Sequence, residues 1–165
     1  MQQTVYFTTR RCVTGSNEYR YFRGVEPLGE ASALTVRSYP VSIRGARVTL
    51  HYTQDMNRTI FPGIHKIVHC AHTGDAFASV IWMSTGSHML YINSEKVDIQ
   101  CQNGVYRFSR NGTEIAVMAP SRKKDTPGFP GDEHWEPQYV MMTAEPVPDQ
   151  LALLMLAFPL LQIAP

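Results

Sequence analysis

The chain has 165 residues, of which 44% are hydrophobic and 18% charged, a composition typical of one globular domain and unlike that of a disordered chain. Fifteen Lys and Arg residues nearly balance fourteen Asp and Glu residues, so the overall charge does not favour a nucleic-acid partner. We therefore expect a single domain over residues 1–165 that binds no nucleic acid.

The first residues of the chain show neither the basic start nor the apolar run of a secretory signal. The three cysteines, Cys12, Cys70 and Cys101, are odd in number and far apart, which favours reduced thiols over a disulfide framework. Both features predict a soluble cytoplasmic protein.

Short segments of alternating or β-rich composition follow one another between turn signals. In chain order they are residues 4–10, 18–24, 33–39, 47–53, 64–72, 75–83, 88–93, 96–102, 105–109, 113–119 and 138–144. The pair Asn103-Gly104 is a strong hairpin signal and predicts an antiparallel meander in the middle of the chain. Cys101 alternates with polar residues in phase with Val97 and Ile99, which predicts that its thiol packs in the core.

Four potential metal ligands, His65, His69, Cys70 and His72, lie close together in the sequence. On a helix His65 and His69 would share one face, as zinc ligands do. On a strand they would lie about 13 Å apart, too far to share one ion, and Cys70 and His72 would point to the other side. Because this segment reads as a strand, we expect no metal here.

Residues 120–137 are rich in Pro, Gly and charge, which predicts a long loop. Two groups in this loop are candidate site residues: the basic run Arg122, Lys123 and Lys124, and the acidic stretch Asp132, Glu133, His134, Trp135 and Glu136. The basic run suits a lipid or phosphate contact, or equally a solvated tip. The acidic stretch could supply a general acid and base, or it could be a solvated loop held by its tryptophan.

The last predicted element is a helix over residues 149–163, with Asp149 as its N-cap and Pro159 as a kink or early end. Its apolar residues surround the helix axis, so we expect the following to be buried: Leu151, Leu153, Leu154, Leu156, Phe158 and Leu161. About 14 residues are too few to cross a bilayer, which needs about 20. A core helix, with no transmembrane segment, is therefore expected.

A helix that is apolar on every side must be shielded from water, and the predicted strands are the elements that can surround it. A helix of about 21 Å matches six-residue strands of about 20 Å, and its width of about 10 Å needs more than the eight strands that fill themselves. The sequence therefore predicts a mostly β protein, a closed antiparallel β-barrel of about twelve strands around a buried C-terminal helix.

The order of the closing elements, namely a hairpin at 105–119, an irregular loop, one strand and an apolar helix at 149–163, resembles the tubby C-terminal-like superfamily. This superfamily includes tubby proteins, phospholipid scramblases and LURP-one-related proteins, and the resemblance is to a bacterial-type single-domain member. It implies a twelve-stranded barrel around a C-terminal helix. The tubby phosphoinositide site has no residue-by-residue counterpart here, and the cysteine-rich acylation segment of scramblases is absent, so the resemblance implies fold and not function.

Our leading interpretation is a non-enzymatic binding module that acts through its rim and the loop at 120–137. Anionic lipid headgroups are the occupant that the resemblance implies, and a protein partner is the other. The candidate ligand-binding residues are Arg122, Lys123, Lys124, His134 and Trp135. The alternatives are a hydrolase-type enzyme that uses the acidic loop at 132–136 with a rim histidine, and a purely structural role. No catalytic arrangement, metal site or cofactor is predicted.

Overall fold

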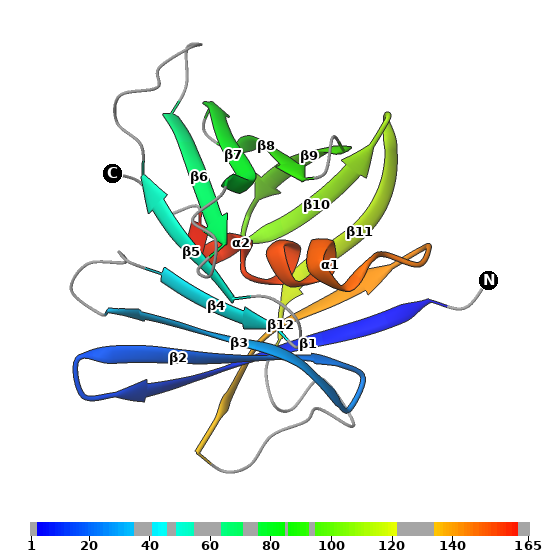
Figure 1. The fold of residues 1–165 in the computed structure, drawn as a ribbon. Helices are drawn as coiled ribbons and strands as arrows, with labels where there is room; N and C mark the ends of the chain where they lie inside the picture. Colours follow the sequence, from blue (N-terminus) through cyan, green and yellow to red (C-terminus); the bar gives the residue numbers. More distant parts are fainter. Residues whose placement is uncertain are drawn as a thin grey trace.

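The computed structural model describes residues 3–34, 41–45, 49–54, 64–70, 76–84, 86–92, 95–121 and 134–161. Within these ranges the chain is mostly β, as predicted, and two short helices follow the strands (Figure 1). The strands are β1 (Thr4–Val13), β2 (Ser16–Arg23), β3 (Glu26–Leu34), β4 (Val41–Gly45), β5 (Thr49–Gln54), β6 (Ile64–Cys70), β7 (Ala76–Ser84), β8 (Ser87–Ile92), β9 (Glu95–Gln102), β10 (Val105–Arg110), β11 (Thr113–Pro120) and β12 (Glu136–Thr143). The helices are α1 (Asp149–Leu156) and α2 (Phe158–Leu161).

Strands that are neighbours in the chain pair antiparallel throughout. β1 also pairs with β12, so the order of pairing returns to the strand from which it began. The turns Asn103-Gly104 and Asn111-Gly112 have positive φ at both residues, which Asn and Gly adopt readily and which tight hairpins require. The predicted antiparallel meander is therefore confirmed.

The predicted strand at residues 33–39 is wrong in its bounds. The chain forms β3 up to Leu34 and resumes as β4 at Val41, and residues 35–40 lie outside the described ranges. The sequence does not predict most of β3 because it contains Pro27, Gly29 and glutamates, residue types that are depleted in strands. Pairing with β2 on one side and β4 on the other outweighs this weak local preference.

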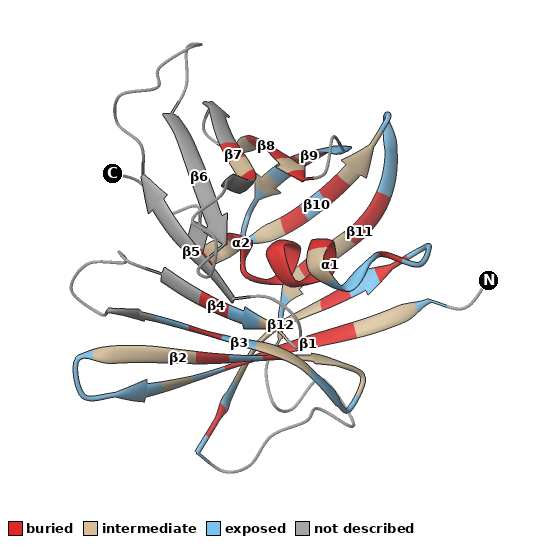
Figure 2. Cartoon of the chain, viewed as in Figure 1, coloured by how far each residue is buried: buried red, intermediate tan, exposed pale blue. Residues whose placement is uncertain are grey.

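The helix α1 lies in the middle of the strands, as Figure 1 shows, and its residues from Leu151 to Leu156 are buried (Figure 2). Each residue from Leu151 to Leu156 is at most 2% exposed, and Phe158 is fully buried. These burial predictions are confirmed, while the side chain of Leu161 lies outside the described part. The strand residues that share this core include Tyr6, Tyr21, Ile43, Leu90, Ile99, Phe108, Met118 and Met141.

The single predicted helix at 149–163 is in fact two. α1 ends at Leu156 with Ala157 as its C-cap, and Pro159 lies in the separate turn α2, so the proline-dependent break is confirmed. Asp149 is not the N-cap: Pro148 occupies that position without a side-chain cap, and Asp149 forms an ion pair with Arg23 of β2. The carboxylate thus ties the start of the helix to the sheet.

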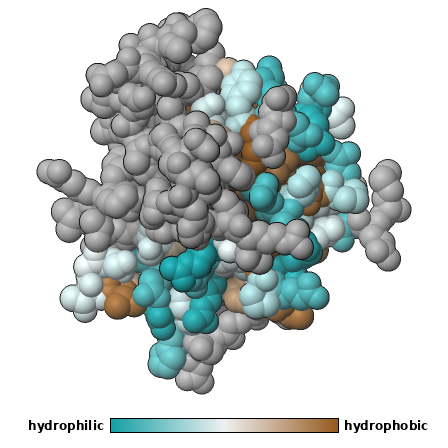
Figure 3. All heavy atoms as spheres, in the orientation of Figure 1, coloured by the Kyte–Doolittle hydropathy of each residue, from teal (hydrophilic) through white to brown (hydrophobic). Residues whose placement is uncertain are grey.

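The described surface is mostly polar on the face drawn in Figure 3, with hydrophobic residues scattered among hydrophilic ones. The large hydrophobic side chains described as exposed are Val13, Val25 and Met142. In the described part of the chain, no helix has the length and apolar composition that crossing a bilayer requires.

Gly29 allows α1 to approach β3 closely. A Cβ atom at this position would lie 2.6 Å from the carbonyl oxygen of Arg44 and 2.7 Å from Cδ1 of Leu153. Both distances are shorter than van der Waals contact, and the first involves backbone that cannot turn away. The side chain of Leu153 therefore fills the space that any other residue at position 29 would occupy.

We expect Gly29→Ala to lower the free energy of unfolding by about 1–3 kcal/mol, the usual cost of overpacking a core. Chemical denaturation of the two proteins measures it. The matched control is Ser32→Ala on the same strand, where the side chain is exposed and a change within about 0.5 kcal/mol is expected. An equal effect of both substitutions would contradict the role given to Gly29.

Truncation before Asp149 should leave the strands without their central apolar partner, and we expect an insoluble product without a cooperative thermal transition. Leu154→Ala, which removes one fully buried side chain, should cost about 2–5 kcal/mol and stay folded. Sedimentation and thermal unfolding of both variants provide the measurement. A soluble truncated chain that melts cooperatively would show that α1 is not the core of the domain.

Candidate functional site

A row of charged side chains crosses the outer face of β2, β3 and β4. Tyr19, Tyr21, Ala31 and Ile43 of these strands are buried in the core. Because alternate residues of a strand point to opposite faces, the residues between them point outward. Arg20 is paired in register with Glu30, and Glu30 with Arg44, so these three side chains form one cross-strand row.

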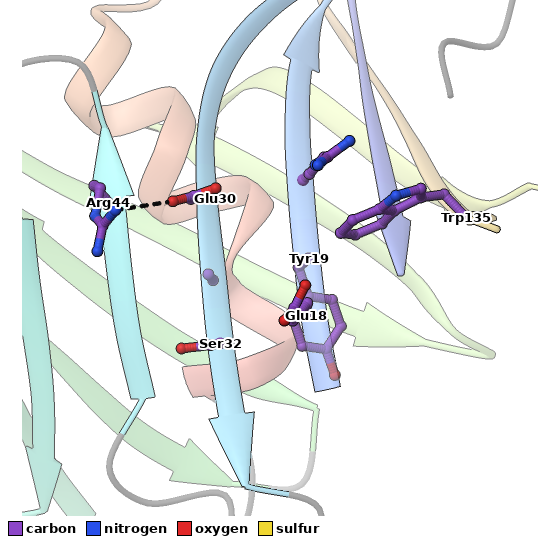
Figure 4. Close-up of a pocket in the computed structure, with 8 residues that line it drawn as sticks. Glu18, Tyr19, Glu30, Ser32, Arg44 and Trp135 are labelled. Carbon is purple, nitrogen blue, oxygen red and sulfur yellow. Dashed lines mark ion pairs between the residues drawn. The ribbon is translucent and has the colours of Figure 1, made fainter. Parts of the chain in front are cut away.

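The row borders a hollow of about 200 Å³. The residues that line it are Glu18, Tyr19, Arg20, Glu30, Ala31, Ser32, Arg44 and Trp135. Glu30 and Arg44 form an ion pair with 3.2 Å between Oε1 and Nη1, drawn as a dashed line in Figure 4. In this view Arg44 lies at one side of the hollow and Trp135 at the other.

Trp135, which directly precedes β12, packs against two arginines of the neighbouring strands. The guanidinium carbon of Arg20 lies 4.2 Å from the centre of the indole ring, and that of Arg11 lies 4.5 Å from it. The tryptophan is 5% exposed, so both arginines shield it from water. Such cation–π contacts hold a guanidinium by its face and leave its in-plane N–H groups able to donate.

Arg20 differs from the arginines around it in its electrostatic partners. Arg11 pairs with Glu18 at 2.5 Å, and Arg44 pairs with Glu30. Arg20 takes part in none of the ion pairs found within the described part of the chain, and its contact is the indole ring. Among the described residues, its positive charge is therefore the one in this row that forms no ion pair with a carboxylate.

A second hollow of about 390 Å³ adjoins the first and shares Arg20, Glu30 and Arg44 with it. Its other lining residues are largely apolar: Tyr21, Phe22, Pro27, Leu28, Gly29 and Gly45. The register between β2 and β3 shifts at Tyr21/Phe22, which leaves Leu28 as an extra residue in β3. Such a bulge bends the strand locally, which accounts for the depression in the surface.

The structure brings one of the predicted site residues, Trp135, into this site. His134 beside it is exposed. The basic run Arg122, Lys123 and Lys124 lies outside the described residues, as do Asp132 and Glu133. Glu136, from the same acidic stretch, pairs with Arg10 at 3.6 Å.

Arg20, Glu30 and Arg44 are not among the site residues predicted from the sequence. Arg20 and its neighbours Tyr19 and Tyr21 carry a usable signal, since aromatic residues that flank an arginine with period two predict an outward-facing cation. The pairing of that cation with Glu30 and Arg44 depends on the register between strands, which local sequence does not show.

The other candidate residues lie away from this site. β6 is a strand, as predicted for the segment with His65, His69 and Cys70, whose side chains, like all of His72, lie outside the described part. His88 is buried in the core, with its ring 5.2 Å from that of Phe158. Cys101 is half-buried and packs against the core, as predicted.

Within the described ranges, no group of three or more His, Cys, Asp or Glu side chains is arranged to hold a metal ion.

Burial raises the pKa of four tyrosines: Tyr19 and Tyr21 of β2, Tyr106 of β10 and Tyr139 of β12. Burial raises the pKa of Tyr19, an effect that the nearby Arg10 partly opposes, and it raises the pKa of Tyr21 still further. Tyr106 and Tyr139 are in edge contact, with 5.9 Å between ring centres, and burial is again the main cause of their raised pKa values. All four phenols therefore favour the neutral form in the folded protein.

The raised pKa values of these tyrosines predict that the folded protein loses stability at alkaline pH. Below about pH 10 these tyrosines are neutral in both the folded and the unfolded protein, so their burial contributes fully to stability. Above about pH 10 they ionise first in the unfolded chain, and the free energy of unfolding falls. We expect tyrosinate absorbance from these residues to appear together with loss of the β circular dichroism signal. The control is the chain unfolded in guanidinium chloride, in which the tyrosines should titrate near pH 10. Ionisation of every tyrosine near pH 10 with the β signal intact would contradict the burial.

Comparison with known proteins gives no relative for this chain: no family model, curated protein or solved structure matches it.

Proposed function

We propose that this protein is a non-enzymatic binding module that holds an anionic headgroup at Arg20 on the outer face of β2–β4. The observation that carries the proposal is the guanidinium of Arg20, stacked on Trp135 and free of any carboxylate partner among the described ion pairs. Stacking fixes the guanidinium, so less rotamer entropy is lost when it binds a carboxylate or phosphate. Arg44 at the far end of the row is paired with Glu30, so Arg20 is the cation of the row that is left for the headgroup.

The proposed architecture supports this function. We interpret the cyclic order of pairing as a closed barrel around α1, the arrangement that a tubby-like domain would have. The interior is then filled by side chains and the helix, which directs binding to the outer face. An anionic lipid is the occupant that such a relationship favours, and a membrane surface presents its headgroups to an exposed site of this kind.

The experiment is co-sedimentation with phosphatidylcholine vesicles that contain or lack phosphatidylserine. We expect binding that needs the anionic lipid and weakens steeply with salt, because exposed charges are screened within about 10 Å at 0.1 M salt. Arg20→Ala should reduce the affinity about fivefold, since one basic residue near an anionic surface contributes about 1 kcal/mol.

The matched control is Arg107→Ala, which removes the same charge from an exposed, carboxylate-paired arginine of β10. It should change the affinity less than Arg20→Ala does. Equal effects of the two substitutions, or equal binding to vesicles without phosphatidylserine, would overturn the proposal.

A further inference from the structure

The second hollow adds an apolar surface directly beside the charged row. Phe22, Pro27 and Leu28 are among the apolar residues that line it, and Arg20 and Arg44 line both hollows. Its volume of about 390 Å³ falls in the range of about 300–1,000 Å³ typical of small-molecule sites. The two hollows together therefore present a polar and an apolar compartment that meet at Arg20.

Resting on the proposed function, we infer that the ligand is a single small amphipathic anion. Its acidic head lies at Arg20 in the first hollow, and its apolar body lies against Phe22, Pro27 and Leu28 in the second. An anionic headgroup at a membrane surface needs only Arg20 and the first hollow. A detached molecule with an acid at one end, such as a medium-chain carboxylic acid, fills both.

The charges around Arg20 limit the head to one negative charge. Glu18 and Glu30 both line the first hollow, and each is paired with one arginine, so Arg20 supplies the remaining positive charge. A second negative charge on the ligand would lie near these carboxylates, and the described residues that line the hollow offer it no cation of its own. The row therefore selects a monoanion and disfavours polyanionic headgroups.

The shape of the second hollow explains why it takes an apolar body. Gly29 and Gly45 are directly paired, and neither places a side chain in the hollow, so its floor there is strand backbone already engaged in pairing. Phe22 is half-buried and forms part of the wall. An apolar group of the ligand therefore contacts apolar residues and backbone that is already engaged in strand pairing. Its removal from water into this surface favours binding.

The test compares three probes by titration calorimetry below the micelle concentration: dodecanoate, acetate and dodecanol. We expect dodecanoate to bind at least about tenfold more tightly than either of the other two, because burial of each CH₂ group and the ion pair with Arg20 both contribute. Dodecyl phosphate at pH 8 should bind severalfold more weakly than dodecanoate, which distinguishes a phosphate source from a carboxylate source. Tighter binding of the phosphate would overturn the selection for a monoanion.

Two substitutions test which hollow holds the acidic head of the ligand and which holds its apolar body. Phe22→Ala should weaken dodecanoate binding about fivefold or more and leave acetate binding unchanged, whereas Arg20→Ala should weaken both. Met142→Ala, which removes an exposed apolar side chain from β12, is the matched control and should change neither. Vesicle binding that depends on Arg20, combined with dodecanoate no tighter than acetate, would overturn this inference and leave the proposed function standing. The absence of both vesicle binding and dodecanoate binding would overturn this inference and the proposed function together.

Discussion

The burial of α1 is the constraint on which the rest of the structure depends. Residues 151–158 have no polar side that water could cover, so the strands must supply apolar partners all around them. The inner positions of β2, β3 and β4 are accordingly filled by tyrosine, alanine and isoleucine. At Gly29 the requirement is strictest, because Leu153 and the backbone of β4 leave no room for a side chain.

The same constraint separates the core from the candidate site. An interior packed with Phe108, Tyr21 and the leucines of α1 leaves polar function to the opposite face of each strand. Strand alternation then separates the two roles within a few residues: Tyr19 and Tyr21 hold the core, while Arg20 between them faces outward. The charged row can therefore vary in sequence without a change in the packing beneath it.

Local sequence predicts the features that arise from local chemistry. The apolar helix, the Asn-Gly hairpins, the break near Pro159 and the packing of Cys101 all follow from spacing within a few residues. β3 and the row Arg20–Glu30–Arg44 do not, because they depend on pairing register across strands and on the bulge at Leu28 of β3. Asp149 shows the same limit: the local sequence favours it as a helix cap, whereas its ion-pair partner is Arg23 of the distant strand β2.

The pairing of β1 with β12 connects the fold to the site. β12 starts directly after Trp135, and its first residue, Glu136, is paired in register with Arg10. The indole ring is thereby held beside Arg11 of β1 and Arg20 of β2, residues far from it in the sequence. Since a lone exposed arginine samples many rotamers, this stacking is what turns Arg20 from a mobile surface charge into a fixed donor. The pairing that joins the first and last strands thus also prepares the cation that the proposed ligand meets.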